Sequence, residues 1–458
     1  MKTRRFLSVF FLVLLLAGHM AVPAGAAERV PDPQVQAKAA LLVDLKTGAV
    51  VYALNEHDEL YPASLTKIMT CLLVLEAIDE GRLTLNQEIA ASPTALEGLA
   101  DDGSSAGIQP GEVLTVEELL YCLMVVSANE AGAILAEKIS GSVDGFVSRM
   151  NAKAQELGCE NTHFMNPHGY HDSQHYSSAW DLYLITKAAM EYPMFMTICD
   201  TGYHVVPATA VSEERQLHNT NYLISGWRSR GYLNADAHGV KTGSHSQAGH
   251  CLVSTAQKAS VSLLCVVLGA ERVQLEDGTW WTYSFGETNK LYDWGFGNFA
   301  YQTVLKQDDL AGEAPVSLSS TDHVTLCPAK TVELLLPKGV EPEELEKTVS
   351  LKADPVEAPI HEGDVLGTMT ITLDGEELAE VDLLAFTGVE ASRLRVFWRD
   401  TKLFFSTTAA KVGLGVAIAL IVVLGGWRLL FSRRRYRYGR SVGGRGRRGG
   451  YRGPRKRR

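Results

Sequence analysis

Two residues of this sequence have the types and the spacing needed for nucleophilic attack on an acyl group. Ser64 and Lys67 are three positions apart, and on a helix this separation brings both side chains to one face. A lysine whose pKa is lowered by burial or by a neighbouring cation is neutral and can accept the hydroxyl proton. The pair therefore predicts a serine nucleophile with its general base, and Lys241 is a candidate for the neighbouring cation.

A second motif, Ser127-Ala128-Asn129, could complete such a site. Ser127 could relay a proton to a departing amine, and Asn129 could orient Lys67 and a substrate amide through its donor and acceptor groups. A Ser-x-x-Lys or a Ser-x-Asn occurs by chance about once in a chain of this length. The argument therefore depends on the joint occurrence of these motifs with a third one.

The third motif is Lys241-Thr242-Gly243, in an apolar segment predicted to be a strand. Lys241 would attract a substrate carboxylate, and Thr242 can hydrogen-bond the same group. Gly243 would let a peptide backbone lie close alongside the strand. Together the three motifs predict acyl transfer on a peptide with a free carboxyl terminus.

Regular elements are predicted around each motif. Apolar runs on either side of Lys46-Thr47-Gly48 predict a β-hairpin over residues 38–54. A helix that begins after Pro62 and ends at Gly81 would hold Ser64 in its first turn. Further helices are predicted over residues 116–126, 130–139, 143–157 and 181–190, and strands over residues 240–255 and 260–268. Strands at both ends with helices between them indicate an α/β arrangement.

The sequence changes character after Phe299. Short alternating apolar segments separated by proline and glycine predict a small all-β domain. These segments cover residues 324–326, 331–336, 368–373 and 380–384. We expect a catalytic domain over residues 28–300, a β-rich domain over 301–396 and a linker over 397–411.

The two ends of the chain predict export and membrane attachment. Residues 1–27 have basic residues, an apolar run and a small-residue exit, which is the pattern of a signal peptide. Residues 412–431 form an apolar segment long enough for a transmembrane helix, and an arginine-rich tail over 432–458 places the C-terminus in the cytoplasm. The basic tail fits contact with membrane lipid, and no nucleic acid partner is expected. The protein is therefore expected to be a single-pass membrane protein with an extracytoplasmic catalytic domain.

The seven cysteines have neither paired nor metal-type spacings, so they are interpreted as buried free thiols. The segment with His163, His168, His171 and His175 could in principle bind a metal. We favour a structural role for these histidines, and neither a metal nor any other cofactor is expected.

The sequence also resembles a known family around the three motifs. The segments PASLTKIMT, LLYCLMVVSANEAGAILAE, HNTNYLI and GVKTGSHSQAGHCLV are similar to those of the low-molecular-mass serine-type D-alanyl-D-alanine carboxypeptidases, the penicillin-binding protein 5-like enzymes of peptidase family S11. The similarity covers about residues 37–300, and weaker likeness continues through APIHEGDVLGTMTI and VDLLAF. The resemblance implies an α/β (α+β) catalytic domain of the β-lactamase/transpeptidase-like fold, a small all-β domain and a C-terminal transmembrane helix.

The resemblance also implies an activity and a partner. The expected reaction removes the terminal D-alanine from peptidoglycan stem peptides that end in D-Ala-D-Ala, and β-lactams are expected as covalent inhibitors. The resemblance implies that Ser64 is the acyl-enzyme nucleophile, Lys67 is the general base, and Ser127 and Asn129 are the second-motif residues. It implies that Lys241, Thr242 and Gly243 form the carboxylate site and that Ser244, the residue after the third motif, belongs to the oxyanion hole. His245 departs from the family, which often has a hydroxyl residue there, so substrate preference is open.

Three other functions share these motifs. A D,D-endopeptidase that cuts cross-links would use the same residues, and the sequence does not separate it from a carboxypeptidase. A class A β-lactamase needs a deacylating glutamate, and no Glu-x-x-Leu-Asn segment lies between the second and third motifs. A non-catalytic wall-binding protein would not be expected to keep every chemical residue.

Overall fold

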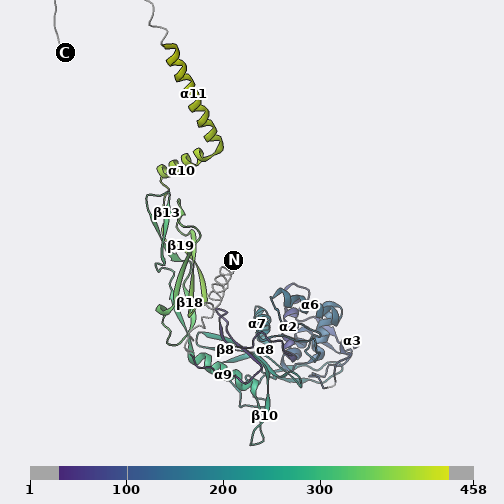
Figure 1. Cartoon of the computed structure of the whole chain (residues 1–458). Helices are drawn as coiled ribbons and strands as arrows, with labels where there is room; N and C mark the ends of the chain where they lie inside the picture. Colours follow the sequence, from purple (N-terminus) through teal and green to yellow (C-terminus); the bar gives the residue numbers. More distant parts are fainter. Residues whose placement is uncertain (1–29, 101, 433–458) are drawn as a thin grey trace, which may run out of the picture. The chain divides into compact units, whose positions relative to one another are not determined.

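The computed structural model describes residues 30–100 and 102–432, so the predicted signal peptide and basic tail lie outside the described residues (Figure 1). The chain divides into two compact units. Of the described residues, the first comprises those up to Asp309 with Lys330–Thr348 and Met369–Val381, and the second comprises Leu310–Ala329, Val349–Thr368 and those from Asp382 onward.

The first unit contains a five-stranded antiparallel sheet in the order β2-β1-β9-β8-β7. The strands are β1 (Ala39–Asp44), β2 (Val50–Leu54), β7 (Ala237–His245), β8 (Gly249–Lys258) and β9 (Val261–Ala270). The hairpin predicted over residues 38–54 is confirmed. The strand predicted over 240–255 is in fact two strands joined by a short turn, so β7 lies at the edge of the sheet.

The two faces of the sheet pack against different layers. On one face, Leu252, Cys265 and Val267 belong to a core cluster with Leu291 of helix α9 (Tyr283–Asn298). Helix α9 was not predicted, because its three glycines weaken the apolar pattern. At Gly295 a Cβ atom would lie 3.0 Å from side chains of the sheet, so this glycine allows the helix to approach closely.

On the other face, residues such as Val253, Leu264 and Val266 join a larger cluster with a layer of helices. Figure 1 shows α2, α6, α7 and α8 of this layer gathered together. The bounds of its helices are α2 (Lys67–Asp79), α4 (Val116–Val125), α5 (Asn129–Ser140), α6 (Val143–Glu156), α7 (Ala179–Met190) and α8 (Pro193–Cys199). Helix α2 has buried residues on all sides, as expected of a central helix. The helices predicted over residues 116–126, 130–139, 143–157 and 181–190 are confirmed within about two residues at each end. The helix predicted to begin after Pro62 starts instead with a 3-10 turn over Ala63–Thr66, which contains Ser64, and becomes an α-helix only at Lys67.

Short elements complete the first unit. These are β3 (Glu88–Ala90), α3 (Pro93–Leu96), β4 (Val113–Thr115), β5 (Tyr203–Val206), β6 (Arg215–His218), β10 (Arg272–Gln274), β11 (Trp280–Thr282), β12 (Phe299–Leu305), β15 (Val332–Pro337) and the 3-10 turns η1 (Ala63–Thr66) and η2 (Pro342–Glu344). Strands β10 and β11 form an antiparallel hairpin.

The second unit is β-rich, as predicted. Strand β13 (Gly312–Ser317) pairs antiparallel with β14 (His323–Pro328) and parallel with β17 (Val356–Glu357). Strand β14 also pairs with the end of β19 (Glu376–Ala385). Two further strands, β16 (Glu346–Leu351) and β18 (Val365–Leu373), have residues in both units.

Two helices follow these strands. Helix α10 (Arg393–Ser406) occupies much of the segment predicted as a linker, and none of its residues is buried. Arg395 lies 3.7 Å from Asp322 and Arg399 pairs with Glu357, while six large apolar side chains are exposed. These side chains are Leu394, Phe397, Trp398, Leu403, Phe404 and Phe405. Helix α11 (Thr408–Ser432) contains the predicted segment 412–431. By length and composition, its segment Thr408–Phe431 could cross a membrane.

Candidate active site

Ser64 lies in η1, directly before helix α2 begins at Lys67. Lys67 Nζ is 3.0 Å from Ser64 Oγ, so the Ser-x-x-Lys spacing brings the two groups together as predicted. Ala63 has a φ of 48°, a left-handed conformation that costs a non-glycine residue about 1 kcal/mol. The carbonyl oxygen of Ala63 accepts a hydrogen bond of 2.8 Å from Thr66 Oγ1, which helps to hold this turn.

Lys67 is fully buried, and its surroundings favour a neutral amine. Burial is the largest cause that lowers its pKa well below the ordinary value, and the charge of Lys241 acts in the same direction. Nζ lies 2.7 Å from both Asn129 Oδ1 and the carbonyl oxygen of His168. A neutral amine has two hydrogens, which these two oxygens can accept, so the lone pair is left facing the Ser64 hydroxyl.

Ser127 and Asn129 lie at the junction between α4 and α5, as the sequence predicted. Ser127 has a φ of 67°, and its Oγ is buried without a hydrogen-bond partner among the described residues. The backbone N–H of Asn129 donates to Ser104 O at 2.8 Å. The junction therefore presents one hydroxyl with free hydrogen-bonding capacity next to the Ser64 and Lys67 pair.

Lys241 belongs to edge strand β7, but its side chain is only 1% exposed. Burial lowers its pKa to about 7, and Nζ donates to the carbonyl oxygen of Thr242 at 3.1 Å. Its ammonium group therefore lies behind the strand, close enough to Lys67 to affect the pKa of that residue. Thr242 Oγ1 lies 2.7 Å from Thr220 Oγ1, which gives two hydroxyls side by side on the open side of the strand.

Gly243 is the point where β7 meets the turn of the nucleophile. A Cβ atom at this position would lie 2.7 Å from Pro62 O, 3.1 Å from Ser64 N and 3.2 Å from Leu65 N. Only glycine permits this approach. The close contact brings the backbone N–H groups of Ser64 and Ser244 to the same region, where they could bind an oxyanion.

A cavity of about 620 Å³ opens at these residues. Five of the eight predicted site residues line it: Ser64, Ser127, Thr242, Gly243 and Ser244. Lys67, Asn129 and Lys241 do not line it but lie buried behind it. The cavity is further lined by Thr220, Arg228 and Arg272, which sequence analysis did not assign to the site.

The histidine-rich segment contacts the turn that holds the nucleophile. His175 Nε2 lies 2.8 Å from Thr66 Oγ1, and its Nδ1 accepts the backbone N–H of Met165 at 3.1 Å. Burial lowers the pKa of His168 and of His175 to about 3, so both rings are neutral. Within residues 30–100 and 102–432, no group of three or more His, Cys, Asp or Glu residues could hold a metal ion. The contacts of His175 support the structural interpretation of this segment.

Comparison with known proteins now gives the family. A family model described as D-alanyl-D-alanine carboxypeptidase, peptidase S11, matches residues 26–272, which is more than half of the chain. The chain belongs to this family. A second model, the C-terminal domain of penicillin-binding protein 5, matches residues 299–391. The family membership predicted from the motifs is confirmed.

Relatives of this peptidase S11 member include carboxypeptidases from Bacillus subtilis and Escherichia coli. The D-alanyl-D-alanine carboxypeptidase DacF of Bacillus subtilis is 32% identical over 400 residues, which is 87% of this chain and 98% of the relative. The corresponding enzyme DacC of Escherichia coli is 31% identical over 376 residues, or 80% of this chain and 87% of the relative.

The solved structure of penicillin-binding protein 5 from Haemophilus influenzae matches with a TM-score of 0.64 at 31% identity. This match covers 79% of the chain and 99% of that structure. The predicted combination of a transpeptidase-like catalytic domain, a β-rich C-terminal domain and a long apolar C-terminal helix is therefore confirmed.

Proposed function

We propose that the protein is a serine-type D-alanyl-D-alanine carboxypeptidase that removes the terminal D-alanine from peptidoglycan stem pentapeptides. The observation that carries this proposal is the position of Lys67. Two oxygens at 2.7 Å account for both hydrogens of the neutral amine, and its lone pair faces Ser64 Oγ at 3.0 Å. This is the arrangement that a serine acyl-transfer enzyme needs at neutral pH.

The reaction would run in two stages. Ser64 Oγ attacks the carbonyl carbon of the penultimate D-alanine while its proton moves to Lys67 Nζ. The resulting oxyanion accepts hydrogen bonds from the backbone N–H groups of Ser64 and Ser244. The C–N bond then breaks, and the nitrogen of the terminal D-alanine takes a proton relayed through the free hydroxyl of Ser127. Water hydrolyses the ester on Ser64, which restores the enzyme.

Recognition of the terminal carboxylate would fall to the third motif. The paired hydroxyls of Thr242 and Thr220 can both donate to a carboxylate in the cavity. Lys241 would add positive potential from behind the strand instead of a direct contact, because its side chain is buried. A released D-alanine would leave a tetrapeptide that can no longer donate to a cross-link, so the protein would limit cross-linking of the wall.

A D,D-endopeptidase is the second candidate. A D-alanyl-D-alanine endopeptidase of Escherichia coli is 30% identical over 251 residues, but this match covers only 54% of the chain and 76% of that relative. The carboxypeptidase relatives match through the β-rich region as well. We therefore favour release of a single terminal D-alanine over hydrolysis of cross-links.

Mass spectrometry of the whole protein in detergent tests the proposal directly. Incubation with diacetyl-Lys-D-Ala-D-Ala should release D-alanine, and incubation with penicillin should give an ester on Ser64. Ser64→Ala should lose both, whereas Ser229→Ala, a change of another serine that lines the cavity, should lose neither. Penicillin labelling that survives Ser64→Ala would overturn the assignment of the nucleophile. Hydrolysis of a cross-linked dimer in preference to the peptide would favour the endopeptidase.

We also propose that α11 anchors the protein as a single membrane span, with the catalytic domain outside and the arginine-rich C-terminus inside. Length and composition of α11 support a span, and the exposed aromatic side chains of α10 suit the membrane interface directly before it. Protease added to wall-stripped cells should release an active fragment. A tag placed after Arg458 should stay protected until the membrane is permeabilised, and a tag that is accessible from outside would refute this topology.

A further inference from the structure

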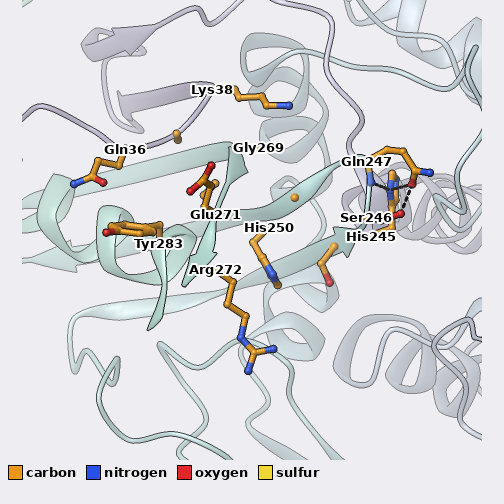
Figure 2. Close-up of a pocket in the computed structure, with 14 residues that line it drawn as sticks. Gln36, Lys38, His245, Ser246, Gln247, His250, Gly269, Glu271, Arg272 and Tyr283 are labelled. Carbon is orange, nitrogen blue, oxygen red and sulfur yellow. Dashed lines mark hydrogen bonds between the residues drawn. The ribbon is translucent and has the colours of Figure 1, made fainter. Parts of the chain in front are cut away.

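Arg272 lies where two cavities meet. It lines the cavity at Ser64 and also a second one of about 790 Å³ beside the ends of β7, β8 and β9, shown in Figure 2. Ser244 and His250 line both cavities as well, and they face each other across the β7–β8 pairing. The two cavities are therefore neighbouring parts of one surface that leads away from the nucleophile.

The guanidinium of Arg272 is available for a ligand. Arg272 forms no ion pair with a carboxylate among the residues that the structure describes, and its guanidinium lies 4.9 Å from the centre of the Trp280 ring on β11. This stacking holds the charge in place without neutralising it. In Figure 2 the neighbouring Glu271 points away from Arg272, as successive residues of an extended chain do.

The electrostatics of the Ser64 cavity favour a carboxylate. The charged side chains that line it are Arg228 and Arg272, and no aspartate or glutamate is among its lining residues within the described part of the chain. Burial and the charge of Arg272 lower the pKa of the neighbouring His250, which favours its neutral form. A cationic wall without acidic groups attracts anionic ligand groups and repels ammonium groups.

The direction of the substrate places Arg272 upstream of the bond that is cut. This step rests on the proposed function. If the terminal carboxylate lies at Thr242 and the attacked carbonyl lies at Ser64 and Ser244, the peptide runs antiparallel to β7. The residue before D-Ala-D-Ala then passes Ser244, whose partner on the neighbouring strand β8 is His250, one strand spacing or about 5 Å from Ser244. Arg272 lines the same two cavities as Ser244 and His250, so a long side chain that extends from the peptide over the ends of β7 and β8 would lead towards Arg272.

We propose that Arg272 is a specificity residue that binds a carboxylate at the end of the side chain before D-Ala-D-Ala. The preferred stem peptide would therefore contain a diamino acid of the diaminopimelate class, whose side chain ends in a carboxylate and an ammonium group. A stem peptide with lysine at this position, which offers an ammonium group alone, would be a poorer substrate.

The test compares three pentapeptides that differ only at this residue: diaminopimelate, diaminopimelate with an amidated side-chain carboxyl, and lysine. For the wild-type protein, kcat/KM for the free acid should exceed that for the amide by about tenfold, as expected for one charge-assisted hydrogen bond. Arg272→Ala should bring this ratio close to one, and Arg272→Glu should reverse the preference in favour of lysine. Arg272→Lys should keep part of it.

Arg228→Ala is the matched control, since Arg228 lines the Ser64 cavity but not the second one. This variant should keep the ratio between free acid and amide close to that of the wild type. An equal ratio for the wild-type protein, or a ratio that survives Arg272→Ala or falls equally with Arg228→Ala, would overturn the proposal. Failure of all three pentapeptides to release D-alanine would instead refute the proposed function.

Discussion

The contact between Gly243 and the nucleophile turn gives the sharpest test of the proposed site. In Gly243→Ala the new Cβ would lie 2.7 Å from Pro62 O, which falls short of an ordinary 3.4 Å contact by about 0.7 Å. Both groups belong to backbone, so no side chain can move aside. Strand β7 must therefore retreat from the turn, and the N–H of Ser244 moves away from Ser64.

Gly243→Ala should affect both folding and catalysis. Overpacking of this kind destabilises a protein by about 1–3 kcal/mol. Displacement of one oxyanion donor by a fraction of an ångström should lower the second-order rate of acylation by about 100-fold. The rate is measured with a chromogenic or fluorescent penicillin by stopped flow, and stability is measured by thermal unfolding of the same samples.

Gly297→Ala is the control for this experiment. It is also a glycine-to-alanine change in the first unit, but nothing lies within 4 Å of its new Cβ atom. The control should acylate like the wild type and should change stability by less than about 1 kcal/mol. If Gly243→Ala acylates within about threefold of the wild type while remaining folded, the close approach does not position the oxyanion donors, and the reasoning from it is wrong.

Three further predictions concern charge. Asn129→Asp places a carboxylate 2.7 Å from Lys67 Nζ, so the pKa of Lys67 should rise and acylation at neutral pH should fall by about 100-fold, recovering as pH increases in a pH–rate profile. The pKa of Lys241 is about 7, so its positive charge is present below that pH and is lost above it. The KM for a peptide with a free carboxyl terminus should therefore rise between pH 6.5 and 8.5, by up to about tenfold per pH unit. The KM should not show this pH dependence for the Lys241→Met variant, or for the wild type with an amidated peptide. Buried Glu112 pairs with Arg215 at 2.7 Å, and hydrogen bonds from this partner hold the pKa of Glu112 at about 2 against an ordinary value of 4.5, despite the opposing effect of burial. Its stabilisation of roughly 3 kcal/mol is present above pH 4.5 and is lost as pH falls towards 2, so acid unfolding of Glu112→Gln should show a weaker pH dependence than that of the wild type.

The local chemistry of the site follows from sequence because it depends on short spacings. Ser64 and Lys67 are one helical turn apart, so a correct helix prediction is enough to bring their side chains together. The junction at Ser127 was likewise visible as a break between two apolar-periodic runs. In both cases the contact is decided by residues within a few positions of each other.

Features that depend on packing between distant segments were not predicted. The sequence gives no sign that Lys241 is buried, because burial depends on the helical layer that covers that face of the sheet. Thr220 lies in the segment HNTNYLI, from which no role for it was predicted. Its hydroxyl is linked to the site only by its contact with Thr242, which joins two distant segments. Arg272 lies in a charged, irregular stretch, and only the β10–β11 hairpin brings it to the cavity.

The structure of α10 decides where a soluble form of this protein should end. A fragment cut at Asp400, in the middle of α10, would keep Leu394, Phe397 and Trp398 exposed on half a helix. Such a surface promotes self-association. Ending the chain at Ser392 removes this surface and costs only the exposed pairs of Arg395 and Arg399, which are worth little in water. The shorter fragment should therefore stay monomeric without detergent, whereas the longer one should elute as aggregates.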